Sequence, residues 1–264
     1  MAALLAPSAG EVHLWKAFLD VESPMLSTLT RSLSPAERAH ALRLRFSRDR
    51  TRFSAGRGWL RRLLSGYLDI DPAGIALGEN TFGKPRLTAP SQQWLRFNVS
   101  HSEGLAVFAV ARGCEVGVDV EQVRDDLPVE AVARRFFSWR DQQLLAALPP
   151  GDRVVAAFAL WARKEAYLKG IGVGFATEHG GRGDPEPEHG DWTITEFNAG
   201  TGFAAAVAVE GLGVEVPDAV RPLSGAVIVG ERAPGLACLR ACHTLVQGLD
   251  PFDNRRRREA PHRH

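Results

Sequence analysis

The sequence predicts a soluble protein of mixed helices and strands, and two observations carry that expectation. Ser34, Pro35 and Glu37 form a helix start, in which a capping serine precedes proline at the first helical position and glutamate stands three residues on. At 116–121, three valines alternate with glycine, aspartate and glutamate, which is the period of a strand. The 264 residues, 45% hydrophobic and 24% charged, suffice for one large domain or two small ones.

Composition excludes several classes of protein. Three cysteines (Cys114, Cys238 and Cys242) are too few for a disulfide scaffold and suit a reducing compartment. No run approaches the roughly 20 apolar residues that a membrane span needs, and the first residues lack the basic region of a secretory signal. A net charge of +1 gives the protein no overall electrostatic attraction to nucleic acid or to a membrane surface. We therefore expect a cytoplasmic protein that contacts neither.

The stretch from Arg31 to Arg62 is strongly basic. It holds ten arginines against Glu37 and Asp49, which is 10 − 2 = +8. One helix is expected to start at Ser34 and a second to run over about 50–68, with an apolar stripe for the core. The arginines fit a solvated helix face or a site for a substrate with several phosphates. Nucleic acid is a third interpretation, but no binding motif supports it.

Two polar motifs follow this stretch. Residues 71–85 are expected to form turns around a short strand at 75–77, with Gly83, Lys84 and Pro85 as a rigid loop that holds the lysine out. Residues 97–102 lead into an apolar strand at 105–110, and Ser100, His101 and Ser102 offer hydrogen-bond donors just before it. A loop lysine is usually only solvated and a lone histidine is usually structural, so neither motif decides the function.

The valine alternation at 116–121 points Asp119 and Glu121 out of the same face of a strand. Two carboxylates at that spacing can share one hard cation, and Gly117 would leave room for a ligand beside them. The competing interpretation is the exposed face of an antiparallel sheet. Mutual repulsion of the two carboxylates favours a bound cation.

A third carboxylate comes from the helix expected at 154–170. Trp161, Glu165 and Lys169 lie at i, i+4 and i+8 on one stripe. A glutamate–lysine pair at this spacing is normally a surface ion pair. Together with Asp119 and Glu121, however, it predicts a centre for Mg²⁺ and phosphate.

Five motifs in series now carry a resemblance to a known family. The segments 83–85, 97–102, 117–121, 135–138 and 161–169 resemble, in order and spacing, those of the Sfp-type 4'-phosphopantetheinyl transferases. The resemblance covers about 12–210 and includes the arginine-rich stretch. It implies an α+β fold of two similar subdomains related by a pseudo-twofold axis, with coenzyme A bound between them. It also implies a monomer that transfers phosphopantetheine from coenzyme A to a serine of an apo acyl or peptidyl carrier protein, as a holo-[acyl-carrier-protein] synthase does.

The resemblance assigns roles residue by residue. Asp119, Glu121 and Glu165 would bind Mg²⁺, with Asp119 counted among the catalytic residues, and Glu165 would be the base for the serine hydroxyl, directly or through water. Lys169 would stabilise the leaving 3',5'-ADP. Coenzyme A would be held by residues of both halves, namely Arg50, Arg52, Arg57, Lys84, Ser100, His101 and Lys169. Arg43 and Arg45 are further candidates for its 3'-phosphate.

The same resemblance divides the chain into three parts. We expect a basic subdomain at 1–112 that binds coenzyme A, a subdomain at 113–210 with the magnesium site, and an extra tail at 211–264 that is partly disordered. The second part would contain a mobile acidic loop at 178–191 and strands at 192–197 and 203–209. Within the tail, the pattern predicts an apolar run at 225–229, a short helix at 236–249 and a basic end at 255–258. Asp141 replaces the glutamate usual in the family.

Two other function classes remain open from the residues. A metal-dependent phosphodiesterase or nuclease could use the three carboxylates and the arginines, but it would leave Lys84 and 100–102 unexplained. An anion-binding protein without catalysis could use the arginines alone, but it would not need clustered carboxylates. Whether the carriers would serve fatty-acid, polyketide or nonribosomal-peptide synthesis is not encoded in these motifs.

Overall fold

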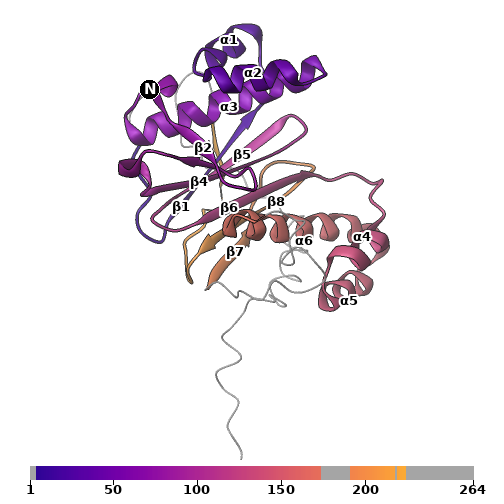
Figure 1. The fold of residues 1–264 in the computed structure, drawn as a ribbon. Coiled ribbons are helices and arrows are strands. Elements are labelled where there is room, and N and C mark those ends of the chain that lie inside the picture. The colour runs from indigo at the N-terminus through magenta and orange to yellow at the C-terminus, as the bar shows by residue number, and fades with distance from the viewer. Residues whose placement is uncertain (1–3, 174–190, 218, 224–264) are drawn as a thin grey trace, which may run out of the picture.

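The computed structural model describes residues 4–173, 191–217 and 219–223, which form two stacked lobes (Figure 1). Each lobe packs one 22-residue helix, α3 or α6, against its own sheet. The predicted α+β fold is confirmed. The features predicted at 178–190, 225–229, 236–249 and 255–258 lie outside the described residues.

The first lobe has three longer helices, α1 (Ser23–Arg31), α2 (Pro35–Arg43) and α3 (Ser47–Leu68), of which α1 and α2 pack against α3. The predicted helix start is confirmed, because Ser34 Oγ accepts from the Glu37 N–H (3.2 Å) and Glu37 Oε2 accepts from the Ser34 N–H (2.8 Å). The second predicted helix begins at Ser47, three residues earlier than expected. Its apolar side buries Trp59, Leu63 and neighbouring residues in the main core cluster.

The sheet of the first lobe has the strand order β4-β5-β1-β9. Its strands are β1 (Val12–Phe18), β4 (Leu95–Ser102), β5 (Leu105–Arg112) and β9 (Arg221–Pro222). The predicted strand at 105–110 is confirmed as β5. Residues 100–102, expected just before a strand, are themselves the end of β4, because Ser100 pairs with Val107 and Ser102 with Leu105 in an antiparallel register. The turn between the two strands follows at Glu103, whose φ is 50°.

A small hairpin, β2 (Leu77–Glu79) and β3 (Pro85–Leu87), projects from this lobe. It is flanked by two single-turn helices, Pro72–Gly74 and Pro90–Gln92. The strand expected at 75–77 begins only at Leu77. The reason is that Ile75 is buried and its carbonyl accepts a hydrogen bond from Arg61 rather than from a neighbouring strand.

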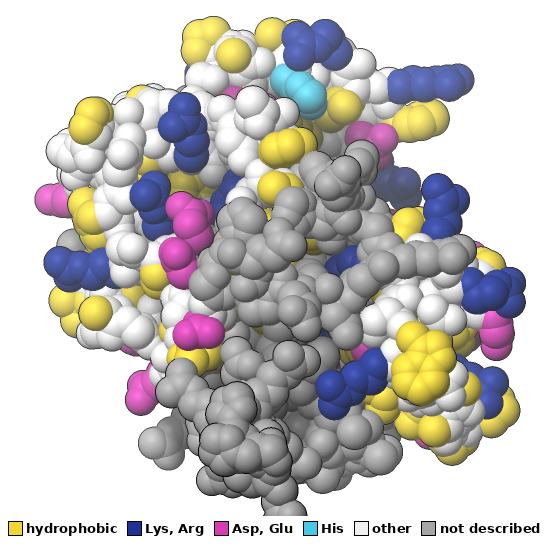
Figure 2. All heavy atoms as spheres, turned by 60° about the horizontal axis from the view of Figure 1, so that its bottom comes forward, with side chains coloured by type: hydrophobic (Ala, Val, Ile, Leu, Met, Phe, Trp, Pro, Cys, Tyr) yellow, Lys and Arg dark blue, Asp and Glu magenta, His cyan; other side chains and the backbone are white. Residues whose placement is uncertain are grey.

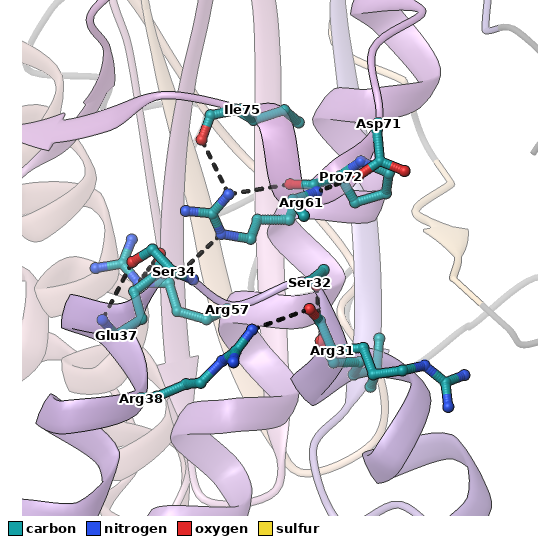
Figure 3. A network of polar contacts seen from close by, with 12 residues as sticks. Arg31, Ser32, Ser34, Glu37, Arg38, Arg57, Arg61, Asp71, Pro72 and Ile75 are labelled. Carbon is teal, nitrogen blue, oxygen red and sulfur yellow. Dashed lines mark hydrogen bonds and ion pairs between the residues drawn. The ribbon is translucent and has the colours of Figure 1, made fainter.

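Arg61 shows that part of the basic stretch is structural (Figure 3). It is 2% exposed, and Nε donates to Glu37 Oε2 at 2.8 Å. Nη1 donates to the carbonyls of Pro72 (3.0 Å) and Ile75 (2.9 Å). Because a buried guanidinium is tolerated only when its donors are satisfied, this arginine ties α3 to the start of α2 and to the segment before the hairpin.

The second lobe has the strand order β6-β8-β7, all antiparallel. Its elements are β6 (Val116–Gln122), α4 (Val129–Phe136), α5 (Trp139–Ala147), α6 (Pro150–Ile171), β7 (Trp192–Glu196) and β8 (Phe203–Glu210). The strands expected at 116–121, 192–197 and 203–209 and the helix expected at 154–170 are confirmed. Val116, Val118 and Val120 are fully buried, as the alternation predicts.

The interpretation of Gly117 as space for a ligand is wrong. A Cβ on this residue would lie 1.9 Å from the Ala166 carbonyl oxygen and 2.3 Å from the Gly170 nitrogen. Gly117 therefore lets the backbone of α6 approach β6 closely. This close approach brings the side chains of the two elements within reach of each other.

The segment after Gly211 differs from the predicted tail in its first part. Strand β9 pairs in parallel with β1, through Trp15 opposite Arg221 and Lys16 opposite Pro222. Val214, Val216 and Val220 pack against the core cluster between the two sheets. The chain therefore returns to the first lobe after completing the second, because this segment covers apolar residues of β1.

Figure 2 shows basic side chains spread around the rim of this face, with acidic side chains among them. Within the described ranges, no helix combines the length and apolar character required to cross a bilayer.

Candidate functional site

The two lobes meet along β4 and β6, and side chains of β4 join them. Asn98 Oδ1 accepts from the Val118 N–H at 2.9 Å. Ser102 Oγ accepts from the Gln122 N–H at 3.0 Å and donates to Glu121 Oε2 at 3.0 Å. Asn98, Ser100 and Ser102 alternate along β4, so their side chains lie on the same face. We call this row the interlobe seam.

An ion pair occupies the middle of the interlobe seam. Asp119 is 2% exposed, and its Oδ1 lies 2.5 Å from Lys169 Nζ of α6. Ser100 Oγ donates to the same oxygen at 2.8 Å and accepts from Lys169 Nζ at 2.9 Å. The structure therefore brings Asp119, Ser100 and Lys169 together from three elements, β6, β4 and α6.

Two further carboxylates share the electrostatic environment of Asp119. Desolvation raises the pKa of Glu121, and the charge of Asp119 raises it further. Desolvation also raises the pKa of Glu165, with the charges of Asp119 and Glu121 acting in the same direction and Lys169 opposing them. The alternation on β6 and the stripe on α6 thus place the three carboxylates within electrostatic range of one another. Partly buried carboxylates with raised pKa values are suited to binding a cation or accepting a proton.

The donor chemistry of this place fits a magnesium ion. Asp119 Oδ2 is buried and has no hydrogen-bond partner among the described residues, and carboxylate oxygens are the ligands that Mg²⁺ prefers. Among these same residues, however, no three carboxylate, histidine or cysteine side chains converge closely enough to enclose a metal. Instead the ammonium of Lys169 contacts Asp119. The predicted ligand set of Asp119, Glu121 and Glu165 stays a prediction.

His101 lies near the end of β4, within electrostatic range of two cations. Its side chain is exposed, yet desolvation by the surrounding protein, followed by the charges of Lys169 and Arg52, lowers its pKa. The ring is therefore neutral near pH 7. Arg52 is held by both oxygens of Asp20 (2.8 Å each) and by Glu103 Oε2 (3.0 Å). Of the predicted arginines, Arg52 is the one whose charge acts on His101.

The other predicted arginines are directed elsewhere. Arg50 Nη1 donates to the carbonyls of Leu44 (2.9 Å) and Arg45 (3.1 Å), which follow the end of α2. Arg57 Nη2 donates to Glu79 Oε1 at 3.1 Å. Arg43 and Arg45 are exposed on the surface. None of these four makes a contact with Asp119, Glu121 or Glu165 in the described part of the chain.

Lys84 is not held out into solvent as its loop predicts. Its side chain is 14% exposed, and Nζ donates to the Gly170 carbonyl at 2.9 Å and to Glu115 Oε2 at 3.0 Å. Desolvation lowers its pKa, and the charge of Glu115 opposes this effect. A cavity of about 350 Å³ lies beside it, and residues of both lobes line it, among them Leu87, Arg96, Glu115 and Gly170.

Two asparagines contribute to the site although the sequence pattern predicted no role for them. Asn98 is 2% exposed and bonds the backbone of β6. Asn80 Nδ2 donates to the carbonyl of Gly172 at 2.9 Å. Asn98 could have been found from its alternation with Ser100 and Ser102, which places the three side chains on one face of the strand. A polar side chain at a buried strand position needs a hydrogen-bond partner.

Comparison with known proteins gives two family matches. Residues 115–208 match the 4'-phosphopantetheinyl transferase superfamily. Residues 20–112 match a family model described as 4'-phosphopantetheinyl transferase, N-terminal. The first match contains Asp119, Glu121, Glu165 and Lys169, and the second contains Lys84, Ser100 and His101.

Individual relatives carry similar names. 4'-Phosphopantetheinyl transferase HetI of Nostoc sp. is 38% identical over 211 residues, which is 77% of this chain and 89% of that protein. The 4'-phosphopantetheinyl transferase of Bacillus subtilis is 30% identical over 145 residues, 55% of this chain and 62% of that protein. The human L-aminoadipate-semialdehyde dehydrogenase-phosphopantetheinyl transferase is 29% identical over 157 residues, 56% of this chain and 51% of that protein.

Proposed function

Because the chain belongs to the 4'-phosphopantetheinyl transferase superfamily, we propose that it transfers the phosphopantetheine arm of coenzyme A to a serine of an apo carrier protein. The transfer releases 3',5'-ADP and makes the carrier competent, as a holo-[acyl-carrier-protein] synthase does. The observation that carries the proposal is the meeting of Asp119, Lys169 and Ser100 at the interlobe seam. Both lobes of one chain supply this site, which supports a monomer as the acting unit.

Three carboxylates are proposed as the metal ligands. Asp119, whose Oδ2 has no hydrogen-bond partner in the described part of the chain, would hold Mg²⁺ together with Glu121 and Glu165. When bound there, the ion would neutralise charge on the pyrophosphate of coenzyme A. The Ser100 and Ser102 hydroxyls orient Asp119 and Glu121 from β4.

Glu165 is proposed as the general base. Its raised pKa makes it a stronger proton acceptor than an ordinary carboxylate. It would take the proton of the carrier serine, directly or through water, while the serine oxygen forms the new bond to phosphorus. The bond between that phosphorus and the bridging oxygen breaks, and 3',5'-ADP departs. Lys169, one turn further along α6, would stabilise the charge that develops on this leaving phosphate.

The nucleotide is proposed to lie toward His101. A neutral ring at the end of β4 can donate one hydrogen bond to a phosphate, and Arg52 places positive charge beside it. Ser100 and Lys169 would complete this group of donors. Arg50, Arg57 and Lys84 remain proposed contacts of coenzyme A, although each is bonded to protein groups in the structure.

Product analysis tests the reaction. The full chain, Mg²⁺, coenzyme A and an apo carrier should yield a carrier with one phosphopantetheine arm on serine and an equal amount of 3',5'-ADP. Glu165→Gln and Lys169→Ala should each lower turnover far more than they weaken coenzyme A binding. The proposal fails if coenzyme A binds but fatty-acid, polyketide and peptide carriers all stay unmodified by mass spectrometry. Hydrolysis of coenzyme A without transfer would point to a phosphodiesterase instead.

A further inference from the structure

We propose that the β2–β3 hairpin positions Glu165 and Lys169 by capping the C-terminal end of α6, with Asn80 and Lys84 as positioning residues. The inference rests on the proposed function, in which Glu165 and Lys169 act on the substrates. It gives the hairpin a role in the reaction that requires no contact with coenzyme A. We call the two contacts to α6 the hairpin clamp.

The hairpin clamp satisfies carbonyls at the end of α6. The last four carbonyls of any helix have no partner inside the helix. Here the Gly170 carbonyl accepts from Lys84 Nζ at 2.9 Å, and the Gly172 carbonyl accepts from Asn80 Nδ2 at 2.9 Å. An ammonium group is favourable at this negative end of the helix dipole. Both donors come from the other lobe, so the clamp fixes α6 relative to β4 as well as capping it.

Asn80 holds the hairpin loop in the form that presents both donors. Its Oδ1 accepts from the N–H groups of Phe82 and Lys84, each at 2.9 Å. The Asn80 N–H donates to the Lys84 carbonyl, and the Gly83 N–H donates to the Asn80 carbonyl, each at 3.0 Å. Gly83 has a φ of 82°, which glycine adopts without strain. The loop is therefore a preorganised cap.

Glu115 extends the hairpin clamp to the start of β6. Its Oε2 lies 3.0 Å from Lys84 Nζ, and its Oε1 lies 3.3 Å from Arg96 Nε. Glu115 directly precedes β6, the strand that carries Asp119 and Glu121. The hairpin thus contacts the end of α6 and the residue that precedes β6, the two elements that supply the three carboxylates.

The clamped carbonyls lie next to the catalytic side chains. Lys169 immediately precedes Gly170, and Glu165 lies one turn before Lys169. The close packing of Gly117 on α6 sets the separation of helix and strand, and the hairpin clamp would set the position of α6 along its axis. A misplacement of about 1 Å at a reacting group can cost about 100-fold in rate. Loosening the clamp at Asn80 should therefore lower turnover without removing any group that is proposed to touch substrate.

The variant Asn80→Asp distinguishes the role of Asn80 in capping α6 from its role in holding the hairpin loop. The aspartate keeps an acceptor for the loop N–H groups but loses the Nδ2–H donor to Gly172. We expect kcat to fall about tenfold or more, with KM and Kd for coenzyme A within about threefold of wild type. Hydrogen exchange should become faster in the last turn of α6, residues 168–172, and stay unchanged in α3. Thr81→Ala, an exposed change in the same loop, is the matched control and should behave as wild type.

Lys84 supplies the second arm of the test. Lys84→Met removes the ammonium but keeps the length of the side chain, and Lys84→Arg restores a cation. If the clamp positions α6, Lys84→Met should reproduce the kcat loss and the faster exchange, and Lys84→Arg should recover part of both. If circular dichroism shows that Asn80→Asp is unfolded, the two Lys84 variants alone test whether the clamp positions α6.

Three results would overturn the inference. The first is faster exchange of the last turn with unchanged kcat. The second is a rise in the Kd for coenzyme A that accounts for the whole loss of kcat/KM while exchange is unchanged, since the hairpin would then be a ligand of coenzyme A. The third is unchanged exchange in both variants. If the wild-type chain modifies no carrier, the proposed function fails, and the exchange measurement alone still supports or overturns the hairpin clamp.

Discussion

The ammonium of Lys169 lies 2.5 Å from Oδ1 of Asp119, so the last turn of α6 is paired with the centre of β6. A buried carboxylate is costly without a partner, and this lysine provides one. A divalent cation that binds Asp119 would compete with that ammonium for negative charge. The pair therefore links the balance of charge in the site to the position of α6.

Asp119→Asn should lower turnover about 100-fold or more, because the variant loses the charge that Lys169 contacts and that the proposed Mg²⁺ would need. The amide keeps the size of the side chain, so the fold should persist. Turnover measured over a range of Mg²⁺ concentrations should show a much higher requirement in the variant. The control is Asp126→Asn, whose side chain is 79% exposed. Equal Mg²⁺ dependence of the Asp119 and Asp126 variants would contradict the assignment of Asp119 as a ligand.

Glu165→Gln should change the pH dependence of stability in the metal-free protein. The pKa of Glu165 is raised in the folded state, so the folded protein holds a proton that the unfolded chain releases. The Glu165 carboxyl therefore costs stability as pH rises from the usual carboxyl range toward its folded pKa. Glutamine has no such cost, so the variant should gain stability relative to wild type as pH increases.

Urea unfolding at several pH values in the presence of a chelator measures this difference. Glu121→Gln should behave in the same direction, because the pKa of Glu121 is also raised. The exposed Glu130 offers a control, and Glu130→Gln should leave the pH dependence of the urea midpoint as in wild type. A difference between wild type and Glu165→Gln that is constant with pH would refute the prediction.

Gly117→Ala should destabilise the protein by about 3 kcal/mol, because the new methyl group would meet backbone atoms of α6 that cannot move aside. Thermal or urea unfolding measures the loss. Gly151→Ala is the matched glycine change on α6, where a Cβ meets nothing within 4 Å. That change should be neutral or stabilising by up to about 1 kcal/mol. Similar stability of the two variants would show that α6 can shift away from β6 at little cost.

Truncation after Gly211 should produce an unstable or insoluble protein, because it removes β9 and the valines that cover β1. Truncation after Leu223 keeps every described element and should keep both the fold and the transfer activity. Soluble yield, thermal unfolding and turnover of the two truncated chains make the comparison. If the two chains are equally stable, residues 212–223 contribute nothing to the core.

The elements that could be predicted have strong local signals. The capping box at Ser34 and the valine alternation of β6 depend on neighbours in the sequence, and both are confirmed. The spacing of Glu165 and Lys169 likewise placed the two side chains on one face of α6. Local periodicity thus accounts for the carboxylates and the lysine of the site.

What could not be predicted depends on contacts between distant segments. The residues around Gly117 give no sign that the backbone of α6 packs against it, because that backbone lies about fifty positions later in the chain. The sequence around Lys84 predicts an exposed side chain, because the carbonyl that Lys84 Nζ contacts belongs to Gly170 of the other lobe. Residues 212–223 lack a long apolar run, since they cover β1 with a few valines and add only the two-residue strand β9 beside it.

The interlobe seam is made of side chains, and this has a consequence for how the enzyme can be altered. In a continuous sheet, backbone groups would join β4 to β6, and among substitutions only proline would remove one of their N–H donors. Here the backbone N–H groups of Val118 and Gln122 bond to Asn98 and Ser102 instead. Asn98, Ser100 and Ser102 therefore supply the polar bonds of this seam, beside the shared apolar cluster and the hairpin clamp that also join the two lobes. Selection or design can loosen or tighten that attachment one hydrogen bond at a time.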